Sequence, residues 1–231
     1  MNRIVVTEYP KSGGTWVTSL IGDALGWPKR DIYVNEQYKA FDVRKHPWYR
    51  GSNILGLLPV CVIKSHELPQ TNLHNFPAQF VHLVRDGRDV VVSKYIYESE
   101  FCVRNGIYER FDVPFDVYLQ REAAQWRDFV LAWRDEPGVI HVRYEDFLAD
   151  PVRELTRLLR RLHRPASQKA ILHAVQQNTK ARWRQALEQV FSYNTFVRKG
   201  EAGNWREYLT EEQERAFRAI AGDALQQFGY L

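Results

Sequence analysis

The stretch EYPKSGGTWVTSL (residues 8–20) has the layout of a loop that holds an anion between a strand and a helix. The apolar run RIVV precedes it, and a segment with helical apolar periodicity follows it. Backbone N–H groups of residues 12–15 would stand at the start of that helix, where free N–H groups and the helix dipole favour phosphate or sulfate. Gly13 and Gly14 would let the backbone approach the anion closely.

The position of Lys11 separates this loop from the common nucleotide-binding loop. The pattern GxxxxGK[ST] places its lysine after the glycines, whereas Lys11 stands before Gly13 and Gly14. We therefore expect Lys11 to reach the anion from the strand side of the loop.

The whole chain (1–231) reads as a single α/β domain. Short, nearly continuous apolar runs are typical of parallel strands that are covered on both faces. They are RIVVT (3–7), VCVIK (60–64), QFVHLV (79–84) and VIHVRY (139–144). Helical patterns occupy residues 15–27, 87–99, 116–136, 150–163 and 210–228. This alternation predicts a P-loop-like domain with a central parallel β-sheet flanked by helices on both faces. The aromatic and basic segment 27–56 has no clean period, and we expect a long loop with short helices there.

Length, composition and charge limit the classes of function that the chain can have. With 231 residues, 45% of them hydrophobic, the chain can bury one sizeable core. Its net charge of +4 suits an anionic ligand but is weak evidence for nucleic acid. Cys61 and Cys102 stand far apart, without zinc or disulfide spacing. Since no apolar run has the length of a membrane span and no signal peptide is recognisable, we expect a soluble cytoplasmic protein.

Polar residues follow the predicted strands at the point where each strand ends. Lys11 follows the first strand, and Arg85 follows the third. The segment Lys64–Ser65–His66 ends the second strand, and Tyr144 ends the fourth. Because open parallel sheets bind ligands beyond the carboxyl ends of their strands, we expect these side chains to converge on one site.

Five segments, in the same order along the chain, resemble the cytosolic-type, PAPS-dependent sulfotransferases. YPKSGGTW resembles their 5′-phosphosulfate loop, and VHLVRDGRDVVVSKY resembles their 3′-phosphate motif. IKSHELP is similar to the segment that carries the family's catalytic histidine. VRYEDFLADP and RKGEAGNW resemble two later family elements. The resemblance implies transfer of a sulfuryl group from 3′-phosphoadenosine 5′-phosphosulfate (PAPS) to a hydroxyl or amine, leaving PAP.

The resemblance also implies roles for single residues. His66 would accept the proton of the acceptor, Lys11 would stabilise the departing phosphate, and Lys64 would lie beside the sulfuryl group. The expected catalytic residues are these three and Ser93. The expected donor-binding set is, for the 5′-phosphate, Lys11, Ser12, Gly13, Gly14, Thr15 and Trp16; for the 3′-phosphate, Arg85, Ser93, Arg198, Lys199 and Gly200; and for adenine, Trp16, Tyr144 and Thr179.

The chemistry suits these residue types. Sulfuryl transfer resembles phosphoryl transfer, an in-line displacement in which positioning and charge stabilisation dominate. A sulfate ester carries less charge than a phosphate, so lysines can take the place of a metal ion, and we expect no metal. Two alternatives stay open: a metal-dependent small-molecule kinase, and a non-catalytic nucleotide-binding module for which His66 is dispensable.

The sequence departs from the family pattern at several positions. The family usually has Thr where Gly14 stands, Asp where Asn204 stands and Phe where Ala181 stands. Trp183 is the candidate to fill the place of that Phe at adenine. Glu211 replaces a Val of the family's dimer motif, so we expect a monomer or a weak homodimer.

The acceptor is the least determined part. We expect a small phenol or alcohol, and neither nucleic acid nor a membrane as partner. Two aromatic groups could wall its pocket or could be ordinary core: Tyr33, Tyr38, Phe41, Trp48 and Tyr49; and Tyr95, Tyr97, Phe101 and Tyr108. Four basic residues could instead favour an acidic acceptor: Lys39, Arg44, Lys45 and Arg50.

Overall fold

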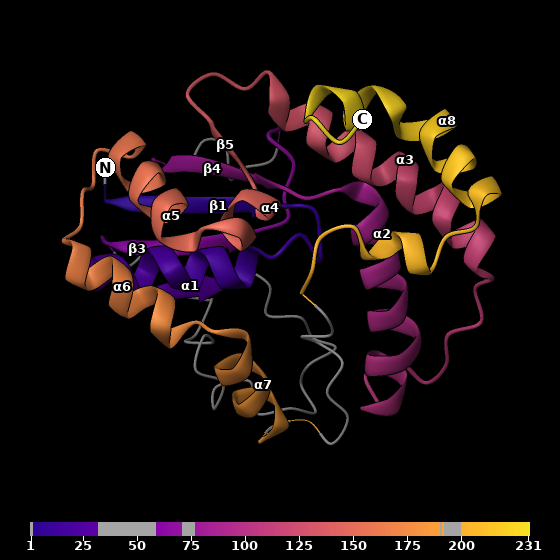
Figure 1. Ribbon diagram of the computed structural model, residues 1–231, viewed down its shortest axis with the longest axis horizontal. Helices are drawn as coiled ribbons and strands as arrows, with labels where there is room; N and C mark the ends of the chain where they lie inside the picture. Colours follow the sequence, from indigo (N-terminus) through magenta and orange to yellow (C-terminus); the bar gives the residue numbers. More distant parts are fainter. Residues whose placement is uncertain (1, 32–58, 71–76, 190, 192–199) are drawn as a thin grey trace.

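A five-stranded parallel sheet forms the centre of the computed structural model, which describes residues 2–31, 59–70, 77–189, 191 and 200–231 (Figure 1). The strand order is β2-β3-β1-β4-β5, and every pairing is parallel. The strands are β1 (Arg3–Glu8), β2 (Lys29–Asp31), β3 (Cys61–Ser65), β4 (Gln79–Val84) and β5 (Ile140–Arg143). In the register, Val5 of β1 lies between Ile63 and Phe80.

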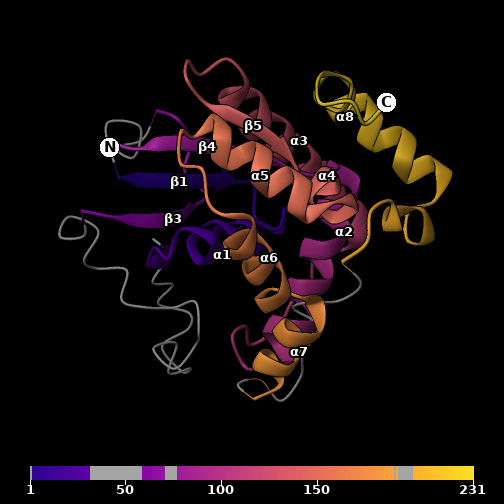
Figure 2. The same ribbon diagram turned by 60° about the vertical axis from the view of Figure 1, so that its left-hand side comes forward.

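Helices cover both faces of the sheet because successive strand side chains point to opposite sides (Figures 1 and 2). Ile4 and Val6 pack with α1 (Gly14–Leu25), α4 (Tyr144–Ala149), α5 (Pro151–Arg161) and α6 (Gln168–Gln177). Val5 packs on the opposite side with α2 (Gly87–Ile96), α3 (Phe115–Arg134) and α8 (Glu211–Gln227). The remaining helical segments are the π-helix Tyr97–Cys102, α7 (Lys180–Glu188) and the 3₁₀ turn Asn204–Glu207. Over the described ranges, every helix is too short or too polar to cross a bilayer.

The structure confirms the predicted parallel sheet and corrects some boundaries. The four predicted strands are present within about one residue at each end, except that Tyr144 begins α4 instead of ending β5. Residues 29–31, predicted as loop, form the edge strand β2; most of the remaining segment lies outside the described residues. The helix predicted over 87–99 ends at Ile96 and continues as the π-helix. Sequence periodicity missed α6 and α7 because each buries only one or two side chains.

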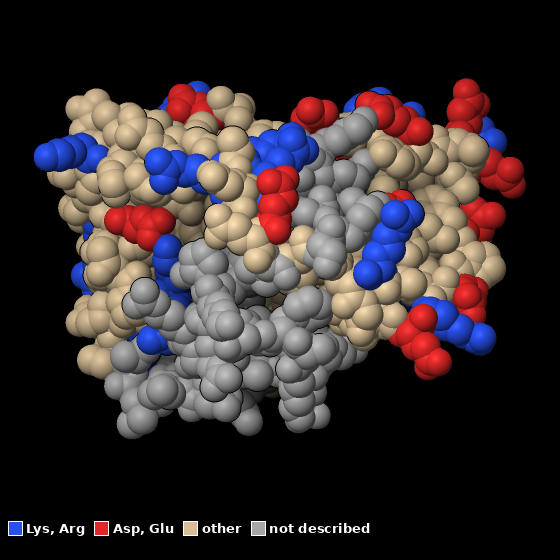
Figure 3. All heavy atoms as spheres, turned by 90° about the horizontal axis from the view of Figure 1, so that it is seen from below, with Lys and Arg blue, Asp and Glu red and all other residues tan. Residues whose placement is uncertain are grey.

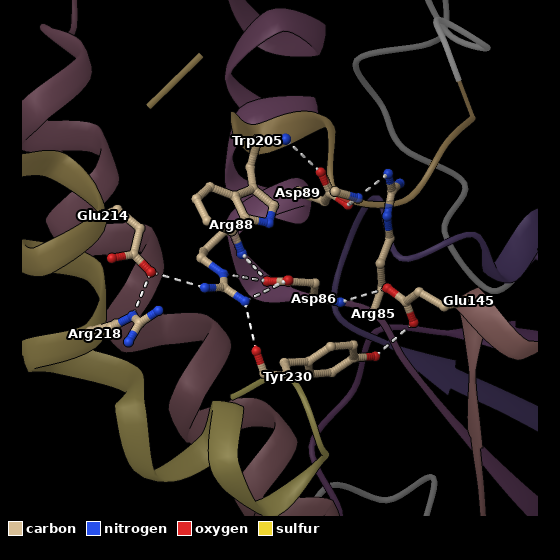
Figure 4. A network of polar contacts seen from close by, with 10 residues as sticks. Arg85, Asp86, Arg88, Asp89, Glu145, Trp205, Glu214, Arg218 and Tyr230 are labelled. Carbon is tan, nitrogen blue, oxygen red and sulfur yellow. Dashed lines mark hydrogen bonds and ion pairs between the residues drawn. The ribbon is translucent and has the colours of Figure 1, made fainter. Parts of the chain in front are cut away.

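A buried arginine fastens the end of the chain to the start of α2 (Figure 4). The Arg88 guanidinium donates to Asp86 at 2.9 and 3.0 Å, to Glu214 of α8 at 2.9 Å, and to the carbonyl of Tyr230 at 2.8 Å. It also lies over the ring of Trp205, 4.2 Å from its centroid. Because these partners come from distant segments, Arg88 sets how α8 and the 3₁₀ turn sit on α2.

Replacing Arg88 with methionine should destabilise the fold by about 3–5 kcal/mol, because it leaves two carboxylates without their buried cation. Urea unfolding would measure the free energy change. The matched control is Arg218→Met, since Arg218 also donates to Glu214 but is half-exposed; its loss should cost less than about 1 kcal/mol. Equal losses for the two variants would contradict this account.

Candidate active site

A cavity of about 350 Å³ brings most of the predicted site residues together. Its lining includes Lys11, Gly13, Gly14, Thr15, Trp16, Lys64, His66, Arg85, Ser93, Tyr144 and Gly200. They come from segments that follow β1, β3, β4 and β5, together with α2 and the loop before the 3₁₀ turn. The expected convergence at the carboxyl ends of the strands is therefore present in the fold.

The loop after β1 is shaped by positive backbone angles. Lys11 has a φ of 75° and Gly13 a φ of 101°, so the chain turns sharply before α1 begins. A Cβ at Gly13 would lie 2.5 Å from the ring of Tyr144. Glycine is thus required at this position both by the backbone angle and by the aromatic ring that supports the loop.

Two of the loop's N–H groups already have acceptors within the protein. The Ser12 N–H donates to the carbonyl of Tyr9 at 3.1 Å, and the Gly14 N–H donates to the carboxylate of Glu8. A Cβ at Gly14 would overlap that carboxylate. The Glu8 side chain therefore occupies the space in which a Thr at position 14 would stand. Sequence analysis missed Glu8, although a lone acidic residue ending an apolar strand just before an anion loop was an available signal.

Two lysines concentrate positive charge in the cavity. Burial and the neighbouring Lys64 lower the pKa of Lys11 to about 7, while the nearby Glu8 acts in the opposite direction. The Lys11 ammonium lies 4.1 Å from the centroid of the Tyr97 ring, which attracts it. A buried ammonium next to another cation is poised to gain from any anion that enters the cavity.

His66 is oriented by the backbone of β1. Its Nδ1 lies 2.9 Å from the carbonyl oxygen of Glu8. A carbonyl can only accept, so Nδ1 carries the proton in this contact and a neutral ring then has its lone pair on Nε2. This tautomer is the one that can accept a proton from a group in the cavity.

Arg85 joins several walls of the cavity, and its contact with Asp89 is drawn in Figure 4. Its guanidinium donates to the carbonyls of Lys11 and Glu201, each at 3.3 Å, and lies 4.7 Å from the centroid of the Tyr144 ring. Asp89, 3.9 Å from Arg85, accepts from the N–H groups of Gly203 at 2.7 Å and Trp205 at 2.8 Å. Burial raises the pKa of the Asp89 carboxyl. Arg85 and Asp89 thus hold the segment after Gly200 against α2.

Some predicted residues lie elsewhere. Thr179 occupies the N-cap position of α7 and does not line the cavity, whereas its neighbours Asn178 and Lys180 do. The Ser12 hydroxyl is buried beneath the loop. Arg198 and Lys199 lie outside the described residues.

The part of the cavity that is expected to hold adenine has aromatic walls. The Trp16 ring meets the ring of Tyr144 edge to face at 5.8 Å, and its Nε1 donates to the carbonyl of Asn178 at 2.9 Å. Trp183, the candidate partner for adenine, also lines the cavity. The cavity wall also includes three residues that were not predicted, Asn178, Leu148 and Lys180, which join it through the placement of α6, α4 and α7.

Comparison with known proteins agrees with the geometry. The sequence matches the family described as "Sulfotransferase domain" over residues 1–229. The chain belongs to this family. It is 24% identical over 239 residues to sulfotransferase 1 family member D1 of Mus musculus, covering 93% of this chain and 80% of the relative. To sulfotransferase 1B1 of Mus musculus it is 26% identical over 244 residues, covering 94% and 80%.

Solved structures share the fold. Mouse sulfotransferase SULT7A1 complexed with PAP matches with a TM-score of 0.72 at 18% identity, covering 99% of this chain and 88% of that one. Retinol dehydratase in complex with androsterone and inactive cofactor PAP matches with a TM-score of 0.71 at 19% identity, covering 97% and 80%. Family and fold together identify the chain as a PAPS-dependent sulfotransferase.

The described lysines and arginines on the face seen in Figure 3 are interspersed with aspartates and glutamates. The basic side chains that matter for an anionic nucleotide are instead those of the cavity: Lys11, Lys64, Arg85 and Lys180. This set, together with the glycine turn, fits a ligand that carries several negative charges.

The affinity of the sulfotransferase for PAP should fall by roughly tenfold for each pH unit above about 7. Lys11, whose pKa is lowered to about 7 by burial and Lys64, must take up a proton to meet the anion, whereas phosphate is already dianionic above about pH 6. Calorimetric titration between about pH 7 and pH 9 would measure the slope. Lys11→Arg should bind with a flatter pH dependence, because a guanidinium keeps its charge. If PAP affinity falls equally steeply with pH in Lys11→Arg, a group other than Lys11 causes the pH dependence.

Proposed function

We propose that this enzyme transfers the sulfuryl group of PAPS to the hydroxyl of a small phenol or alcohol by in-line attack, with His66 as the base. The observation that carries the proposal is the shared cavity of Lys11, Lys64 and His66 beside the glycine turn. PAPS, when bound, supplies an activated sulfuryl group on a good leaving group. The protein would position the donor and the acceptor, stabilise the developing charge and accept one proton.

His66 would act on the acceptor. With its Nδ1 proton donated to the carbonyl of Glu8, the ring presents the Nε2 lone pair and can take the hydroxyl proton as attack begins. The backbone contact also fixes the ring plane, so rotation of the imidazole is restricted. Ser65, which precedes His66, fastens the same turn because its hydroxyl accepts from the Glu67 N–H at 3.0 Å.

Lys11 and Lys64 would act on the developing charge. Lys11 lines the cavity and precedes the start of α1, so its ammonium would approach the anion from the strand side. It would stabilise the negative charge on the departing phosphate oxygen, while Lys64 would lie beside the sulfuryl oxygens. Among the residues that the structure describes, no cluster of three His, Cys, Asp or Glu side chains is placed to bind a metal. We propose that Lys11 and Lys64 provide the charge stabilisation.

The donor would lie along the cavity. Gly13, Gly14, Thr15 and Trp16 would hold the 5′-phosphate, while Arg85 and Ser93 would hold the 3′-phosphate. We also propose that Arg198, Lys199 and Gly200 close over the 3′-phosphate. Adenine would lie against Trp16 and Tyr144, whose rings meet edge to face at 5.8 Å and would both offer it aromatic contact.

An apolar alcohol is the favoured acceptor. Tyr97 lines the cavity and stacks on Phe101, which is fully buried behind it. The first aromatic group of the sequence, Tyr33 to Tyr49, lies outside the described residues. Retinol dehydratase, which shares the fold, has been crystallised with retinol and with androsterone, both apolar alcohols. A monomer or weak homodimer in the cytoplasm, acting on small molecules, completes the proposal.

Replacing His66 with alanine should lower the rate of labelled-sulfate transfer from PAPS to a panel of phenols and alcohols by about 10²–10⁴-fold. PAP affinity should stay unchanged, because His66 acts on the acceptor. The control is His173→Ala, an exposed histidine on α6, which should keep full activity. All assays would contain a chelator. Transfer that requires metal, or that survives the loss of His66, would overturn the mechanism.

Replacing Arg85 with glutamine should reduce the preference for PAP over AMP. The two ligands differ by the 3′-phosphate, and a lost charged hydrogen bond to it corresponds to roughly ten- to hundredfold in affinity. Because AMP binding controls for damage to the rest of the cavity, the ratio of the two dissociation constants is the readout. An equal loss for both ligands would show that Arg85 shapes the cavity without contacting the 3′-phosphate.

A further inference from the structure

The anion loop of this chain holds a carboxylate of its own. Glu8 ends β1 with only 2% of its surface exposed, and its carboxylate accepts the N–H of Gly14, the first residue of α1. That N–H belongs to the helix start at which the donor's 5′-phosphate is expected. Gly14 carries no side chain, and any Cβ there would overlap the carboxylate. Glu8 and Gly14 therefore form a matched pair.

The cationic side chains near Glu8 favour its ionised, negatively charged carboxylate. Lys11 follows three residues later, and the negative charge of Glu8 raises the pKa of Lys11 against the effects of burial and Lys64. Arg85 adds a further positive charge near Lys11. With three cations around the loop, an internal carboxylate partly compensates their mutual repulsion while the donor is absent.

The carboxylate and a phosphate cannot both keep this position. The Gly14 N–H offers a single hydrogen, and two anions at one helix start repel each other. The backbone of Glu8 is held by its pairing opposite Leu83 and by the contact of its carbonyl with His66. Displacement would therefore involve the side chain of Glu8, while its backbone contact with His66 is kept.

We infer that the Glu8 carboxylate is an internal competitor of the donor nucleotide, bound to the Gly14 N–H until the 5′-phosphate displaces it. The inference rests on the proposed donor site. Its consequence is that the charge of Glu8 lowers the affinity for PAPS and PAP, which shortens the lifetime of the product complex.

The test compares two ligands in two variants. Glu8→Gln keeps the shape but replaces a charged acceptor by a neutral one, so PAP should bind on the order of tenfold more tightly. Adenosine 3′-phosphate, which lacks the 5′-phosphate, should bind equally to the wild type and the variant. Calorimetry at about pH 6, below the pKa of about 7 of Lys11, keeps that lysine charged in the wild type.

The matched control is Glu154→Gln, which makes the same change of net charge. Glu154 is a buried carboxylate on α5, paired with Arg153 and Arg157 and absent from the cavity lining. It should leave both affinities unchanged. If Glu8→Gln fails to tighten PAP, or tightens adenosine 3′-phosphate equally, the inference is wrong.

A crystal structure of the wild type with PAP tests the same point without any variant. A phosphate oxygen on the Gly14 N–H with the Glu8 carboxylate turned away would support the competition. A carboxylate that stays on Gly14 beside bound PAP would overturn it and leave the proposed function intact. Failure of the wild-type protein to bind PAP would instead overturn the proposed function.

Discussion

The shape of the cavity depends on the buried guanidinium of Arg85, which is only 8% exposed. It donates to the carbonyls of Lys11 and Glu201, lies over the ring of Tyr144 and faces Asp89. One side chain thus joins the loops after β1 and β4, the start of α4 and the loop before the 3₁₀ turn. A buried cation is stable only when such partners surround it. Moving any one of these segments would remove a partner of the guanidinium, so Arg85 restrains all of them.

The positive charges that line the cavity are partly balanced by carboxylates of the protein. Lys11, Lys64, Arg85 and Lys180 line a small cavity, and burial already brings the pKa of Lys11 to about 7. The protein supplies two carboxylates among these cations, Glu8 at the helix start and Asp89 behind Arg85. Asp89 accepts the N–H groups of Gly203 and Trp205, whereas the Glu8 carboxylate accepts the N–H of Gly14 at the helix start. The Glu8 carboxylate therefore stands where the 5′-phosphate of the donor is proposed to bind, and Asp89 does not.

Much of this site was predictable because parallel strands end at one edge of a sheet. The residues after the apolar runs, Lys11, Lys64, His66 and Arg85, had to meet there whatever the loops did. The edge strand β2 and the helices α6 and α7 were missed because they bury few apolar side chains, so their sequences carry no clear period. Thr179, expected at adenine, caps α7 and is not among the residues that line the cavity, and its position depends on that unpredicted helix.

The sequence by itself determined the parallel sheet, the polar residues that follow each strand and the glycine turn. These features depend on local apolar patterns and on the freedom of the glycine backbone. The short motifs predicted the family, and the family model that matches residues 1–229 confirms it. Only the tertiary structure decided that Tyr144 supports Gly13, that Tyr97 receives the Lys11 ammonium and that the Glu8 carboxylate takes the N–H of Gly14. Such contacts join a strand, a loop and a helix through single side-chain rotamers, and a linear pattern does not specify which rotamer the packed neighbours allow.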